Sequence, residues 1–258
     1  MSIKNVDFVF TSLYSVWSKN KKELLMSHYA CLVIGKKPED QLAPFDENIA
    51  GNKNAKWDWY VLGGRFTGYF KLKKNRPGEL GERGVFNNSP KKGYADIVKL
   101  KDIDFEGMRC DAIKLATKRY STLNKLCNNE IPKLIPWEKF EKEKKSIKEK
   151  RDLYWNQEGF KRFNSLKKNA NKKDKDFLEE IDLDKFQMSQ EEYVTKHANK
   201  AGVPFAIIKD GKWHEKGEMG WFAMVSDEKT DEKWQKEVAK LFSDLPPNTV
   251  FSLYDLHI

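Results

Sequence analysis

Strand-like sequences stand toward both ends of this chain, with a long charged stretch between them. The runs are short, rich in apolar and β-branched residues, and separated by turn residues, which is the pattern of β-strands. Because a sheet must bury an apolar face, the two groups are predicted to pair in one antiparallel-rich sheet. This predicts an α+β fold, with a ferredoxin-like core as the expected topology. The predicted strands cover residues 28–35, 57–62, 66–72, 203–208, 221–225 and 249–258.

The middle of the chain has the period of helices. Large apolar residues recur there at roughly helical spacing in a background rich in Lys and Glu. Ser189 stands three residues before Glu192, which is the spacing of a capping box at a helix start. The predicted organisation is an N-terminal extension (1–25), an α+β core (26–105 with 200–258) and a helical insertion (106–199).

The positive charge is concentrated in one segment. The chain has a formal net charge of +9, and residues 137–176 hold 14 Lys and Arg against 8 Asp and Glu. Such a segment is typical of a solvated helix face, and the alternative is a patch that binds nucleic acid or an acidic partner. Outside it the chain is close to neutral, so the overall charge does not by itself indicate nucleic-acid binding.

The cysteines indicate the redox environment. Cys31, Cys110 and Cys127 are few, odd in number and form no CxxC pair. This is typical of reduced thiols in a cytosol and argues against a disulfide framework or a four-ligand zinc site. The sequence also lacks a run of about 18 apolar residues, so we expect no membrane-spanning helix. The expectation is a cytoplasmic protein without metal or cofactor.

Gly63-Gly64-Arg65 is the best candidate for ligand binding in the sequence. Two glycines let backbone N–H groups converge on an anion, and an arginine fork makes two contacts to a phosphate or carboxylate. The structural alternative is equally physical. In that interpretation the glycines turn a hairpin, and Arg65 pairs with Asp58.

Aromatic residues surround this motif and could stack on a base or a sugar. Strand alternation predicts that Trp57 and Trp59 share one face, which we expect to be core. Asp58 and Tyr60 would then face a ligand or solvent. A further candidate is Trp221, which follows the turn at Gly217-Glu218-Met219-Gly220.

Three residues near the C-terminal end could carry acid–base chemistry. Asp255 and His257 are two apart on a predicted strand, so their side chains share a face and could orient a general base or bind a metal. Glu218, between two glycines, could complete an acidic site. The alternative is a histidine bonded to a neighbouring carboxylate for structural reasons. His28 and Cys31, in a strand context, are predicted to be structural.

Several of these motifs together resemble a family of uncharacterised phage and prophage proteins. The resemblance rests on His28-Tyr29 before a strand, residues 42–48 (LAPFDEN), residues 57–65 (WDWYVLGGR), residues 217–221 (GEMGW) and the final Asp255-Leu256-His257-Ile258. It covers the two ends of the chain and not its helical middle. It implies a phage-encoded protein that acts inside a bacterium, and it implies no particular activity.

These observations favour a binding protein over an enzyme. The leading hypothesis is recognition of a nucleotide-like or phosphate-bearing ligand through Asp58, Tyr60, Gly63-Gly64-Arg65 and Trp221. In a phage context, such a protein could counteract host defence by sequestering a signal or by blocking a defence protein. One alternative is a phosphodiester or nucleotide hydrolase that uses Glu218, Asp255 and His257. Another is an interaction module that binds nucleic acid or protein through residues 137–176.

Overall fold

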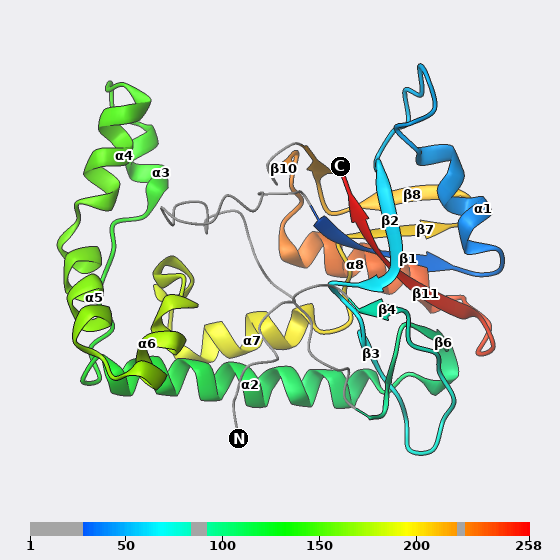
Figure 1. Ribbon diagram of the computed structural model, residues 1–258, viewed down its shortest axis with the longest axis horizontal. Helices are drawn as coiled ribbons and strands as arrows, with labels where there is room; N and C mark the ends of the chain where they lie inside the picture. Colours follow the sequence, from blue (N-terminus) through cyan, green and yellow to red (C-terminus); the bar gives the residue numbers. More distant parts are fainter. Residues whose placement is uncertain (1–27, 84–91, 221–224) are drawn as a thin grey trace. The chain divides into compact units, whose positions relative to one another are not determined.

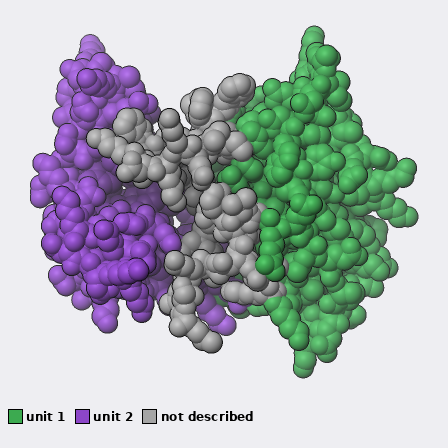
Figure 2. Space-filling view, viewed as in Figure 1, with its two compact units in different colours: residues 1–110, 199–258 green, residues 111–198 purple. Residues whose placement is uncertain are grey.

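The computed structural model describes residues 28–83, 92–220 and 225–258 (Figure 1). The predicted N-terminal extension, most of the predicted strand at 221–225, and Trp221 itself lie outside the described residues. The chain divides into two compact units, coloured separately in Figure 2. Unit 1 comprises Met1–Cys110 and Asn199–Ile258, and unit 2 comprises Asp111–Ala198.

Unit 1 is built on a seven-stranded mixed sheet with the order β4-β2-β11-β1-β7-β8, in which β6 also pairs with β11. The strand β11 lies antiparallel between β1 and β2, and β7 runs parallel to β1. The α+β class is therefore confirmed, and strands from the two ends of the chain do share a sheet. The predicted ferredoxin-like core has a split βαβ order, in which another strand separates the two parallel strands. Here the parallel strands β1 and β7 are direct neighbours, which makes the sheet mixed. The bounds are β1 (His28–Ile34), β2 (Trp59–Gly64), β4 (Glu82–Arg83), β6 (Ile97–Lys99), β7 (Ala206–Lys209), β8 (Lys212–Glu215) and β11 (Val250–His257).

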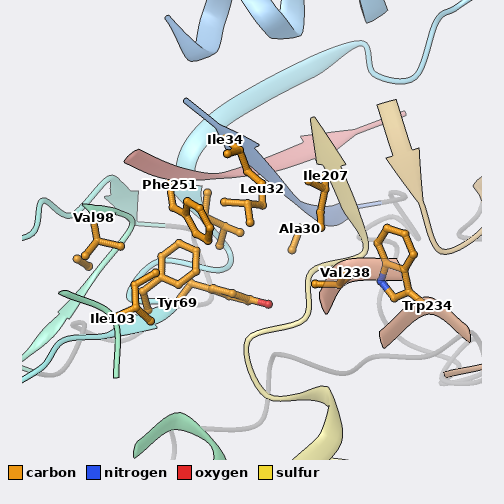
Figure 3. Close-up of a cluster of buried hydrophobic side chains, with 13 residues drawn as sticks. Ala30, Leu32, Ile34, Tyr69, Val98, Ile103, Ile207, Trp234, Val238 and Phe251 are labelled. Atoms are coloured by element: carbon orange, nitrogen blue, oxygen red, sulfur yellow. The ribbon is translucent and has the colours of Figure 1, made fainter. Parts of the chain in front are cut away.

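The central strands β1 and β11 are buried along almost their whole length because both faces of the sheet are covered. One face carries Leu32 and Leu253. It packs against Trp234 and Val238 of α8 (Asp231–Ser243) (Figure 3). The opposite face packs against Leu42 of α1 (Pro38–Leu42), Phe45 of η2 (Ala43–Phe45) and Trp57. Cys31 lies in this second core and is fully buried, as expected.

The turn between β7 and β8 follows from its sequence. Asp210 and Gly211 have φ values of +52° and +69°. Positive φ at both central residues is the requirement of a type I′ hairpin turn, and Asp-Gly is among the preferred pairs. The remaining short elements of unit 1 are β3 (Phe70–Lys71) paired with β5 (Tyr94–Ala95), η3 (Leu100–Asp102), and β9 (Glu218–Met219) paired with β10 (Val225–Ser226).

Unit 2 is helical. Its core is rich in aromatic side chains, including Tyr154, Phe163 and Tyr193. The predicted capping box is confirmed, because Ser189 Oγ accepts a hydrogen bond from Glu192 N and Glu192 accepts one from Ser189 N. Among the described residues, no helix is long and apolar enough to cross a membrane. Two helices cross the unit boundary, α2 (Phe105–Leu126) and α7 (Gln190–Lys200). The others are α3 (Trp137–Glu141), α4 (Ile147–Trp155), α5 (Glu158–Asn169), α6 (Lys172–Glu179) and η4 (Leu183–Phe186).

Candidate functional site

Two histidines face each other where β1 begins and β11 ends. His28 and His257 are direct partners in the antiparallel register, and their ring centroids are 5.0 Å apart. His28 Nδ1 lies 2.8 Å from Asp255 Oδ1, which we name the inner pair. His257 Nδ1 lies 2.6 Å from Asp58 Oδ1, which we name the outer pair. An ionised carboxylate only accepts hydrogen bonds, so in both pairs Nδ1 donates.

The two pairs differ in burial. In the inner pair the side chains of His28 and Asp255 are 8% and 1% exposed. In the outer pair the side chains of His257 and Asp58 are 17% and 39% exposed. Within the described part of the chain, the Nε2 atom of His28 is buried and has no hydrogen-bond partner. The outer pair is therefore partly open to solvent, while the inner pair lies in the protein interior.

Asp255 and His257, which were predicted to orient a general base or bind a metal together, have different partners in the structure. The two residues share a face of β11, but Asp255 binds His28 and His257 binds Asp58. His28, expected to be structural from its strand context, is thus the partner of a residue 227 positions away. The partner of His28 depends on the antiparallel pairing of β1 with β11, whose register sets His28 opposite His257.

At the Gly63-Gly64-Arg65 motif the backbone lies against the carboxylate of Asp255. The N–H of Arg65 donates to Asp255 Oδ2 at 2.8 Å. Gly64 has a φ of +53°, and a Cβ added there would lie 2.5 Å from the same Oδ2 atom. Glycine is needed because a side chain would collide with the carboxylate. A backbone N–H does meet an anion here, as expected, but that anion is Asp255.

The motif also departs from its predicted shape. Gly63 and Gly64 are the last residues of β2 rather than a break after it. The alternative pairing of Arg65 with Asp58 is not the arrangement found, since Asp58 pairs with His257. Burial lowers the pKa of the half-buried Arg65, and the nearby Asp255 opposes this shift.

Asp96 supports the loop after Gly64 and was not singled out by the sequence patterns. It is fully buried. Its carboxylate accepts hydrogen bonds from Thr67 Oγ1 at 2.8 Å, from Gly68 N at 2.7 Å and from Gly81 N at 2.9 Å. A lone acid within the otherwise apolar stretch Tyr94–Val98 was the available signal. Because its acceptors are used by the protein's own backbone, Asp96 is a structural residue.

The two tryptophans of the motif lie in different environments, so the prediction that they share a core face is wrong. Trp57 precedes β2, forms an isolated bridge with Asp46, and is buried with its Nε1 donating to Leu42 O. Trp59 begins β2 and is 47% exposed. Strand alternation did not apply because the regular strand starts only at Trp59. Trp59 packs edge-on against the ring of His28, at a centroid distance of 5.8 Å.

Tyr60 belongs to the second core rather than to the exposed surface beside the outer pair. Its ring contacts those of Trp57 and Tyr254 at centroid distances of 4.9 and 5.7 Å. Burial raises the pKa of Tyr60. Tyr60 is half-buried, so the aromatic surface most open beside the histidines is Trp59.

Glu218 is exposed, and its ion pair is with Lys56 at 4.0 Å, while Lys56 also lies 2.8 Å from Glu215. Of the three predicted catalytic residues, the structure therefore brings Asp255 and His257 to one site and gives Glu218 a different partner. In the described ranges, no group of three or more His, Cys, Asp or Glu side chains is placed to hold a metal ion.

Comparison with known proteins adds no relative. A scan against family models, a search of curated proteins and a search of solved structures each found no match. What this site can bind or catalyse therefore follows from its own geometry and chemistry.

Proposed function

We propose that this chain binds a nucleotide-like, phosphate-bearing ligand at the surface formed by Trp59 and the outer pair. The observation that carries the proposal is the exposed indole of Trp59, beside two imidazoles whose centroids are 5.0 Å apart. An exposed aromatic ring offers a stacking surface to a base, and His257, which faces Trp59 in the strand register, is the accessible imidazole beside it.

The resemblance to phage proteins supplies the setting of the proposal. A phage protein that binds a nucleotide signal inside a bacterium could withdraw that signal from a host defence system. The stacking surface and the imidazoles suit such a ligand. Blocking of a defence protein is the other use that the resemblance allows, and the ligand experiment separates the two.

Isothermal titration calorimetry with a panel of nucleotides and cyclic dinucleotides tests the proposal. Trp59→Ala removes the stacking surface and is expected to weaken binding by about 5- to 150-fold, because a base stack contributes about 1–3 kcal/mol. Ile135→Ala is the control, because Ile135 is an apolar residue that is 50% exposed and belongs to unit 2. Absence of binding across the panel, or equal affinities for wild type and Trp59→Ala, would overturn the proposal.

A second candidate function is nucleic-acid binding by unit 2. On α4, the exposed apolar side chains of Ile147, Leu153 and Trp155 flank the exposed basic residues Lys148 and Arg151 in the sequence. Basic residues with an exposed aromatic ring are the elements of single-strand binding.

Charge reversal tests this second function better than deletion. Residues 137–176 include core residues such as Tyr154 and Phe163, so their removal would unfold unit 2. Lys148→Glu with Arg151→Glu is expected to weaken binding of a single-stranded oligonucleotide and to reduce its salt dependence. Equal affinity at all salt concentrations for the double variant and wild type would exclude this surface.

A further inference from the structure

We infer that His257, oriented by Asp58, is a general base that hydrolyses a phosphodiester bond of the bound ligand. This inference rests on the proposed ligand binding and adds a reaction to it. It differs from the hydrolase expected from the sequence, because Asp58 takes the orienting role and Glu218 has none. The distinguishing observation is that two pairs of the same composition lie side by side with only one of them accessible.

The outer pair has the geometry of an oriented base. The distance of 2.6 Å between His257 Nδ1 and Asp58 Oδ1 fixes the ring and holds the proton on Nδ1. The lone pair is then on Nε2, which is the atom that can accept a proton from water. Both side chains are partly exposed, so a water molecule and a ligand can reach them.

The inner pair serves as support for the outer one. His28 and Asp255 are almost completely buried, which keeps them away from a substrate. The ring of His28 lies against those of His257 and Trp59, with centroid distances of 5.0 and 5.8 Å. The Arg65 N–H holds the other oxygen of Asp255. We therefore assign His28 and Asp255 as positioning residues and His257 as the catalytic residue.

The reaction balances with water as the only co-reactant. His257 Nε2 takes a proton from water as the water oxygen forms a bond to phosphorus. The bond between phosphorus and the leaving nucleoside oxygen breaks on the opposite side of the phosphorus, that oxygen takes a proton from solvent water, and the imidazolium releases its proton to solvent. The products are a phosphomonoester and an alcohol. Trp59 would hold a base of the substrate beside this centre, so the substrate class is a linear or cyclic dinucleotide.

The experiment measures binding and turnover on the same samples. The full chain is incubated with linear and cyclic dinucleotides, products are followed by ³¹P NMR, and affinities are measured by calorimetry. Asp58→Asn is expected to lower kcat by about 10² to 10⁴-fold, the usual contribution of an oriented base, with less than about threefold change in affinity. His257→Gln is expected to abolish turnover, and Ile135→Ala, which removes an exposed apolar side chain of unit 2, is expected to match wild type. Far-UV circular dichroism checks that each variant is folded.

The outcomes separate the two proposals. Turnover that depends on both His257 and Asp58 supports the inference. A dinucleotide that binds and is recovered intact overturns the inference and leaves the binding proposal standing. If no dinucleotide binds and none is cleaved, the proposed function fails together with the inference. Turnover that persists in both variants also overturns the inference, because the base would then lie elsewhere.

Discussion

The inner and outer pairs have the same two residue types at neighbouring positions of one sheet, and they differ mainly in burial. A buried pair of ionisable groups depends on every partner, because removing one leaves the other uncompensated in the interior. An exposed pair contributes little to stability, since water and salt screen it. A His–Asp pair is therefore expected to have a structural role in the interior, whereas the same pair at the surface is open to solvent.

The largest effect is expected from Asp255→Ala. It leaves His28 buried without its carboxylate and removes the acceptor of the Arg65 N–H. Breaking a buried pair in this way is expected to lower the free energy of unfolding by about 3–5 kcal/mol. Urea denaturation followed by circular dichroism measures the loss. A loss below about 1 kcal/mol would show that the inner pair is not the structural one.

Gly64→Ala comes next. The new Cβ would meet Asp255 and would require a left-handed backbone, since φ is +53°. Left-handed conformations of this kind cost about 1–3 kcal/mol, and the collision adds to this cost. Gly211→Ala is the matched control, because its φ is +69° but nothing lies within 4 Å of the added Cβ. Equal losses in the two variants would mean that the contact with Asp255 is unimportant.

The smallest effect on stability is expected from Asp58→Ala. The outer pair is partly exposed, so its loss is expected to change the free energy of unfolding by less than about 1 kcal/mol. The same variant is expected to lose the turnover proposed for His257. Denaturation and turnover assays on one preparation check both statements. A stability loss as large as that of Asp255→Ala would remove the distinction between the pairs.

The parts of the fold that local sequence determines were predictable. Short runs rich in apolar residues predicted β1 and β11, and Ser189 with Glu192 predicted a helix start. The fully buried Cys31 also follows from its apolar neighbours. In each case the residues that decide the structure lie within a few positions of one another, so the pattern contains the physical cause.

The site itself was only partly predictable. Asp58, Gly64 and His257 stood out as residue types, but their partners depend on strand register, which spacing along the chain does not give. Alternation also failed at Trp57, because the strand begins two residues later. The glycines were read as a cradle for an external anion, whereas the anion is Asp255, which lies 190 positions beyond Arg65.

The pairing of β1 with β11 also bears on how the protein folds. His28 and Asp255 are 227 positions apart, and all of unit 2 lies between them in the sequence. Closing so long a loop costs entropy before any contact compensates for it, and sequence-distant pairings of this kind fold slowly. The candidate site and the centre of the sheet are therefore expected to form together, in one late event. In a refolding experiment, recovery of ligand binding should follow the slowest phase, whereas the helices of unit 2 can form earlier from local contacts.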